Sequence, residues 1–87
     1  MTEGQVDVIK LFRDAAFEVS NRKFDSLDRG TVISQLGMDS VAVMELVSYC
    51  EEKLNVRMPD EDLARINTIG DLSALIQKLM PNVKVLS

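Results

Sequence analysis

The spacing of apolar residues along this chain predicts helices. Between residues 5 and 19, Ile9, Phe12, Ala16 and Val19 recur every three or four positions, and most of the charged residues fall between them. Residues at this spacing share one face of a helix, because an α-helix has about 3.6 residues per turn. Residues 5–19 are therefore predicted to form an amphipathic helix with one buried face.

Two further helices are predicted near the middle of the chain. Residues 40–54 carry an apolar stripe with intervals of three and four positions, and Asn55 is a residue that commonly follows a last turn. The third helix is predicted over residues 60–66, after Pro59. It opens with three acidic residues, which favour a helix N-terminus through the helix dipole. The stripe of the second helix comprises Val43, Leu46, Val47, Cys50 and Leu54.

The fourth helix is predicted over residues 69–79. Thr68 and Asp71 stand three positions apart at its start and resemble a capping box in which Asp replaces the usual Glu. Pro81 ends the pattern because proline cannot continue a helix. Residues 82–87 are predicted to be frayed.

A long connection, residues 21–39, separates the first two helices. Connections of this length are uncommon in compact domains unless they are functional or disordered. This one is predicted to be ordered because it carries enough apolar residues to hold it against the helices. The fold class is therefore predicted as all-α, a four-helix bundle in one domain over residues 1–87, with a long first loop and a short third helix. The apolar residues of the loop are Phe24, Leu27, Val32, Ile33 and Leu36.

The amino-acid composition excludes several kinds of functional site. The chain of 87 residues has no histidine and one cysteine, so it has no internal disulfide, no zinc site of Cys and His, and no Ser–His or Cys–His nucleophilic pair. We interpret Cys50 as a small buried apolar residue rather than a reactive thiol. Aromatic residues make up only 5%, which suits a core of aliphatic side chains between packed helices.

The net charge of −4 lies in one stretch of the sequence. Residues 39–65 hold seven acidic and three basic residues, and the rest of the chain holds seven of each. This distribution predicts no nucleic-acid or membrane partner and attraction to basic protein surfaces, although a merely solvated face is the alternative. Residues 1–5 lack the apolar core of a signal peptide, and we expect a soluble, cytoplasmic monomer.

The candidate site lies where the long loop meets the second helix, at Gly37, Asp39 and Ser40. Glycine permits a positive φ and a sharp turn into the helix. Either Asp39 or Ser40 can cap the helix, and a phosphate on Ser40 would sit in the favourable field of the helix N-terminus. A short string of this kind also arises by chance as a simple helix cap.

The sequence resembles the acyl carrier protein family at several places that occur in the family's order. The resemblance covers roughly residues 11–79. The matching runs are Leu36-Gly37-Met38-Asp39-Ser40-Val41, Glu45-Leu46-Val47 with Glu51-Glu52-Lys53-Leu54, Pro59-Asp60-Glu61, and Thr68-Ile69-Gly70-Asp71-Leu72.

This resemblance implies a fold of the acyl carrier type and a non-catalytic carrier. It implies that a phosphopantetheinyl transferase attaches the 4′-phosphopantetheine of coenzyme A to Ser40, so that the chain is a phosphoprotein. Acyl intermediates of fatty-acid, polyketide or related secondary-metabolite biosynthesis are then held on the arm as thioesters and presented to partner enzymes. Asp39 and Gly37 support the attachment site. The helices can shelter the acyl chain.

A partner-docking patch is expected beside Ser40 on the second helix. Val41 and Met44 would supply apolar contacts to transferring, condensing or modifying enzymes with basic docking surfaces, and acidic residues would steer the encounter. The alternative is that Met44 packs at the edge of the core. The expected patch comprises Val41, Met44, Glu45, Ser48, Glu51 and Glu52.

The chain departs from the family pattern near the site. Val41 replaces the usual Leu, Ala42 stands where an acid is frequent, and Ser34 and Gln35 replace acids before the Leu-Gly pair. These changes reduce the acidic character of the partner surface and favour a specialised pathway.

Other functions compete with the carrier hypothesis. The nearest is a peptidyl or aminoacyl carrier of a nonribosomal type of pathway, which would share the fold, the serine and the arm. An interaction module with an unmodified Ser40 is a further alternative. A hydrolase lacks a base beside Ser40, and the loop window 25–36 lacks the oxygen ligands of a calcium site at three of the four positions checked.

Overall fold

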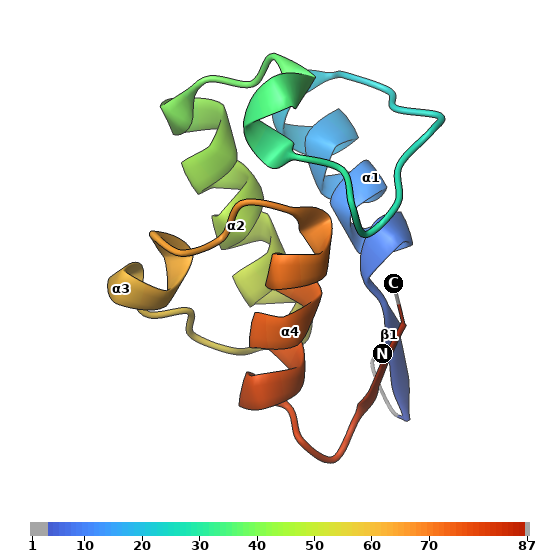
Figure 1. The fold of residues 1–87 in the computed structure, drawn as a ribbon, viewed down its shortest axis with the longest axis vertical. Helices are drawn as coiled ribbons and strands as arrows, with labels where there is room; N and C mark the ends of the chain where they lie inside the picture. Colours follow the sequence, from blue (N-terminus) through green and yellow to red (C-terminus); the bar gives the residue numbers. More distant parts are fainter. Residues whose placement is uncertain (1–3, 87) are drawn as a thin grey trace.

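The computed structural model describes residues 4–86, and these fold into four α-helices with a short two-stranded sheet beside them (Figure 1). The second and fourth helices span the predicted residues. The predicted arrangement of four helices, with a long first loop and a short third helix, is present. In chain order the elements are β1 Gln5–Asp7, α1 Val8–Ser20, the 3-10 helix η1 Ile33–Leu36, α2 Ser40–Leu54, α3 Asp60–Leu63, α4 Ile69–Leu79 and β2 Lys84–Leu86.

The first helix begins later than the apolar pattern predicts. Residues 5–7 form strand β1, and the prediction of helix over these positions is wrong. Asp7 explains the boundary, because its backbone is extended and its carboxylate accepts a hydrogen bond from the N–H of Lys10 at 3.2 Å. A capping aspartate of this kind starts a helix at the next residue.

The chain ends pair with each other in parallel, Gln5 opposite Lys84 and Val6 opposite Val85. The prediction that the tail is frayed is therefore wrong for residues 84–86, while Ser87 lies outside the described residues. The side-chain amide of Gln77 directs the tail towards this pairing by donating to the carbonyl of Val83 at 2.8 Å. Strand β1 thus joins the start of α1 to the end of the chain.

Helix α3 is shorter than predicted and ends at Leu63 rather than residue 66. Beyond it, the N–H of Arg65 donates to the backbone carbonyl of Asp62 at 3.1 Å, and the N–H of Ile66 donates to the carbonyl of Leu63 at 3.2 Å. Each of these hydrogen bonds joins residues three positions apart, rather than the four of an α-helix, and winds the backbone more tightly. The segment after Leu63 therefore forms turns and not a further helical turn. None of the residues of α3 is buried.

The core lies between α1, α2 and α4, where Phe12, Leu46 and Ile76 are almost fully buried. The long loop is ordered, as predicted, because Ile33 is buried in this core. Backbone hydrogen bonds also join the loop to the start of α4, among them one from the N–H of Gly70 to the carbonyl of Arg29 at 2.8 Å.

No helix of residues 4–86 is long and apolar enough to cross a membrane.

Candidate functional site

Ser40 is the first residue of α2 and is exposed, directly after a sharp turn out of the long loop. Gly37 takes the predicted positive φ, 80°, at the end of η1. The carboxylate of Asp39 accepts a hydrogen bond from the N–H of Ala42 at 2.8 Å. The sequence left both residues open as the helix cap. In the structure Asp39 is the residue that caps α2, and Ser40 is not the cap.

Arg22 contributes to the site in a way that sequence analysis missed. Its Nη1 donates to the carbonyl of Gly37 at 3.2 Å, and its guanidinium lies 5.4 Å from the ring centroid of Phe24. A Cβ at Gly37 would lie 3.3 Å from the guanidinium, so glycine suits both the turn and this contact. The two residues are fifteen positions apart, and no local motif marks such a pair.

A cavity of about 710 Å³ adjoins Ser40. Its wall is formed by one face of α2, by the end of the long loop and by the segment that follows α2. Met58, which is only 3% exposed, belongs to this lining. Sequence analysis did not identify this cavity, because its lining comes from separate parts of the chain, with Phe12 of α1 and Leu72 of α4 also contributing. Its apolar residues include Phe12, Ile33, Met38, Val43, Met44, Leu46, Val47, Met58, Leu63, Ile66 and Leu72.

The expected docking residues divide into two groups. Met44, Ser48 and Glu51 line the cavity together with Ser40, which places them along one face of α2 at intervals of three and four residues. Met44 is nevertheless 68% exposed and thus forms part of the rim. The other group is exposed and is not part of the cavity lining; it comprises Val41, Glu45 and Glu52.

Glu51 holds the segment after α2 in place. Its Oε2 accepts a hydrogen bond from the backbone N–H of Met58 at 2.7 Å, and Glu51 itself is half-buried. The carboxylate is therefore engaged within the molecule, whereas the neighbouring Glu52 is exposed. Glu51 and Glu52, which the sequence pattern had placed in one docking patch, therefore lie in different environments.

Cys50 lies in the core, as predicted from its position in the apolar stripe. Burial raises the pKa of its thiol to about 12, with a smaller contribution from Glu51. The thiolate is the nucleophilic form of cysteine, and burial disfavours that form in Cys50 at neutral pH. Ser40, by contrast, presents an exposed hydroxyl at the start of α2.

Comparison with known families finds one match that spans most of the chain. Residues 12–76 match the family described as "Phosphopantetheine attachment site". The matched range contains the whole of the cavity lining and the turn at Ser40.

Individual relatives agree with this match. The acyl carrier protein of Rhodococcus erythropolis is 45% identical over 47 residues, which are 54% of this chain and 52% of the relative. The meromycolate extension acyl carrier protein of Mycolicibacterium smegmatis is also 45% identical over 47 residues, 54% of this chain and 48% of the relative. Each match thus spans about half the length of the relative.

The fold has a counterpart among solved structures. The crystal structure of an acyl carrier protein from Thermotoga maritima superimposes with a TM-score of 0.78 and is 27% identical. The superposition covers 85% of this chain and 87% of that protein.

Proposed function

The chain belongs to the family of acyl carrier proteins that hold covalent 4′-phosphopantetheine, and we propose that Ser40 is its attachment residue. The observation that carries the proposal is the exposed position of Ser40 at the start of α2, beside a cavity of about 710 Å³. When bound, the arm supplies a thiol that holds an acyl group as a thioester. The chain itself acts as a carrier and not as a catalyst.

The first turn of α2 suits a phosphodiester on Ser40. Its backbone N–H groups lack partners within the helix, and the dipole of this fifteen-residue helix favours a negative charge there. The Asp39 carboxylate is already paired with the N–H of Ala42. The proposed modification therefore needs no rearrangement of the cap.

The cavity supports an acyl cargo with an apolar chain. Met38 and Met58 are buried in its lining, and methionine side chains adapt to ligands of varied shape. We propose that the cargo comes from fatty-acid, polyketide or related secondary-metabolite biosynthesis. A relative named as a meromycolate extension acyl carrier protein supports an acyl cargo. An aminoacyl cargo would gain less from this lining, because its amino group is charged.

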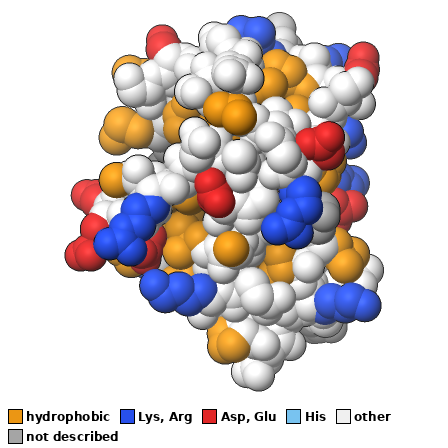
Figure 2. Space-filling view, in the orientation of Figure 1, with side chains coloured by type: hydrophobic (Ala, Val, Ile, Leu, Met, Phe, Trp, Pro, Cys, Tyr) orange, Lys and Arg blue, Asp and Glu red, His pale blue; other side chains and the backbone are white. Residues whose placement is uncertain are grey.

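Partner recognition is proposed for the exposed side of α2. Val41 and Met44 are 64% and 68% exposed and lie within about one turn of Ser40, where a docked enzyme would contact both. Glu45 and Glu52 are exposed on the same helix and would attract basic enzyme surfaces, a phosphopantetheinyl transferase among them. Acidic side chains also gather over α3 (Figure 2). A monomeric, cytoplasmic carrier remains the prediction.

The attachment residue is tested by intact mass after incubation with coenzyme A and a broad-specificity phosphopantetheinyl transferase. We expect the wild type to gain one phosphopantetheinyl group and Ser40→Ala to gain none. Ser48→Ala is a matched control, because Ser48 is also an exposed serine of α2 that borders the cavity; it should still be modified. An unmodified wild type beside an active control carrier would refute the proposal.

The cargo class is tested separately on the modified protein. Acyl and aminoacyl groups are each offered with their own loading enzymes, and the products are compared by mass. We expect acyl loading. Selective aminoacylation by a dedicated adenylating enzyme would instead support the peptidyl carrier function.

A further inference from the structure

Arg22 joins the end of α1 to the turn that precedes Ser40. The long loop leaves α1 after Ser20 and reaches α2 through η1 (Figure 1). Nη1 of Arg22 donates to the carbonyl of Gly37 at 3.2 Å, and the two residues are fifteen positions apart. Gly37 lies three residues before Ser40. The hydrogen bond therefore spans the loop and ends beside the candidate attachment residue.

The position of Arg22 is set by α1. Asn21 takes a positive φ of 53°, a common ending of an α-helix, and the N–H of Arg22 donates to the carbonyl of Ala16 at 3.4 Å. The guanidinium lies 5.4 Å from the ring centroid of Phe24. The carbonyl of Phe24 in turn accepts a hydrogen bond from Nε of Arg13, on α1, at 3.0 Å. Both the backbone and the guanidinium of Arg22 are thus placed by contacts that lead back to this helix.

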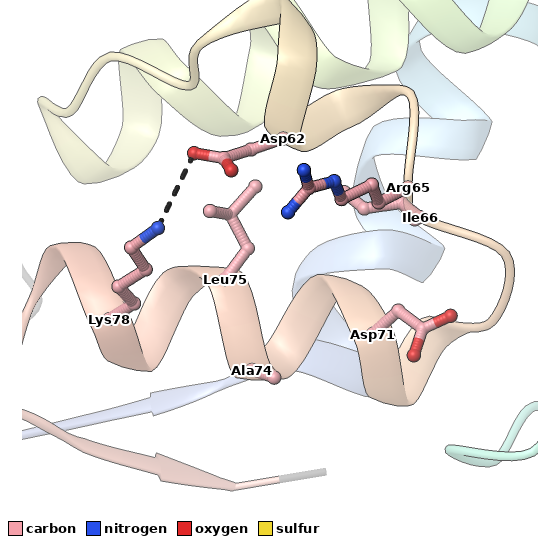
Figure 3. A pocket seen from close by; sticks show the side chains of 7 residues that line it. All are labelled: Asp62, Arg65, Ile66, Asp71, Ala74, Leu75 and Lys78. Carbon is pink, nitrogen blue, oxygen red and sulfur yellow. Dashed lines mark ion pairs between the residues drawn. The ribbon is translucent and has the colours of Figure 1, made fainter.

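No ion pair draws Arg22 away from the loop carbonyl. Two ion pairs occur among residues 4–86, and Arg22 belongs to neither. One joins Lys10 to Asp14 within α1 at 2.9 Å. The other joins Nζ of Lys78 on α4 to Oδ2 of Asp62 on α3 at 3.7 Å (Figure 3). The guanidinium can therefore keep a carbonyl as its acceptor.

The turn at Gly37 is a point where an outside contact matters. Glycine accepts many backbone conformations because it lacks a Cβ, and Gly37 is exposed with a φ of 80°. Met38 is buried directly after it, and Asp39 caps α2. The contact with Arg22 restrains the exposed glycine between η1 and this cap.

We propose that Arg22 is a positioning residue for the modification of Ser40. Its hydrogen bond to Gly37 holds the turn in the conformation that a phosphopantetheinyl transferase binds. A carrier whose turn adopts this conformation for only part of the time binds the enzyme more weakly by the same fraction. This inference rests on the proposed function, because it requires transfer of the arm to Ser40.

The test is the steady-state rate of modification with coenzyme A and a broad-specificity phosphopantetheinyl transferase, followed by intact mass. In this reaction the Ser40 oxygen bonds to the phosphorus that carries the pantetheine, the adenosine bisphosphate leaves, and the hydroxyl proton passes to the enzyme or to water. We expect Arg22→Ala to raise the KM for the carrier about fivefold, the factor typical of one hydrogen bond, and to leave kcat unchanged. Arg22→Lys should recover part of the loss, since its Nζ can donate to the same carbonyl.

Lys23→Ala is the matched control. Lys23 is the next residue, is also exposed, and belongs to neither ion pair of residues 4–86. The substitution removes the same charge and should leave KM unchanged. An equal rise in KM for Lys23→Ala and Arg22→Ala would assign the effect to surface charge and overturn the inference. An unchanged KM in Arg22→Ala, or a fall in kcat alone, would overturn it as well.

Nuclear magnetic resonance of the unmodified protein tests the contact itself. The carbonyl of Gly37 and the nitrogen of Met38 belong to one peptide group, so loss of the hydrogen bond from Arg22 should shift the amide nitrogen resonance of Met38. Arg22 is exposed, so Arg22→Ala should fold, and the rest of the spectrum verifies this. Lys23→Ala should leave the Met38 resonance in place. A rise in KM without the shift, or the shift without a rise in KM, would contradict the inference.

Failure of the proposed function gives a different pattern of results. If Ser40 is not the attachment residue, the wild type stays unmodified or Ser40→Ala is still modified, whichever residue occupies position 22. The inference about Arg22 fails alone when the wild type is modified at Ser40 and Arg22→Ala keeps the wild-type KM.

Discussion

Replacing Glu51 by alanine should destabilise the protein, whereas replacing its neighbour Glu52 should not. The carboxylate of Glu51 accepts a hydrogen bond of 2.7 Å from the N–H of Met58, and the acceptor is half-buried. Met58 is 3% exposed, so water cannot readily take the place of the lost partner. Glu52 is exposed on the outer side of the same helix.

The expected loss in the free energy of unfolding follows from the type of hydrogen bond that Glu51→Ala removes. A hydrogen bond to a charged group contributes about 1.5–3 kcal/mol, and a buried donor left unpaired adds its own desolvation cost. We therefore expect Glu51→Ala to lower the free energy of unfolding by about 2–3 kcal/mol. For a domain of this size that corresponds to a fall in Tm on the order of 10 °C. Glu52→Ala should stay within about 0.5 kcal/mol of the wild type.

Both variants are measured by urea unfolding of the unmodified protein, followed by circular dichroism. Glu51→Gln retains an acceptor oxygen and should recover part of the loss, which separates the hydrogen bond from the charge. If Glu51→Ala and Glu52→Ala unfold at the same urea concentration, the role assigned to Glu51 is wrong. The two glutamates would then act alike, as the sequence pattern suggested.

Other predictions concern the loop, the last helix and the cysteine. Gly70→Ala should lower the free energy of unfolding by about 1–3 kcal/mol in a urea titration, because the new Cβ would lie 2.9 Å from the carbonyl oxygen of Arg29. Hydrogen bonds from backbone N–H groups at the start of α4 lower the pKa of Asp71 below 3.8. Its stabilising effect is therefore present above that pH and lost as pH falls through the folded-state pKa, and Asp71→Asn should remove this part of the pH dependence of unfolding. The pKa of the Cys50 thiol, about 12, predicts that iodoacetamide labels it at neutral pH only after unfolding, as measured by mass.

Local signals in the sequence predicted the elements that local interactions determine. The capping box at Thr68 and Asp71 forms with both of its hydrogen bonds, and Asn55 ends α2 with a positive φ of 56°. Each of these features depends on residues within four positions of one another. The motif at Gly37 and Asp39 likewise gave the turn that precedes Ser40.

Contacts between residues that are far apart in the sequence could not be predicted from these local signals. The pairing of β1 with β2 joins segments from opposite ends of the chain, each only three residues long, and neither has an alternating pattern long enough to indicate a strand. The cavity has the same origin, because its lining combines Phe12 of α1 with residues near Met58 and Leu72. Periodicity indicates which face of a helix is apolar and does not indicate where two such faces leave a gap.

The arrangement around Ser40 would keep the proposed attachment apart from the contacts that stabilise the turn. A serine that caps a helix uses its side-chain oxygen to accept a hydrogen bond from the first turn, and modification of that oxygen would compete with the cap. Here Asp39 caps α2 at 2.8 Å from the N–H of Ala42, and Arg22 holds the preceding turn through the carbonyl of Gly37. The fold around the turn is thus maintained by residues other than Ser40. The attachment that we propose at Ser40 would therefore leave the contacts that hold the site together in place.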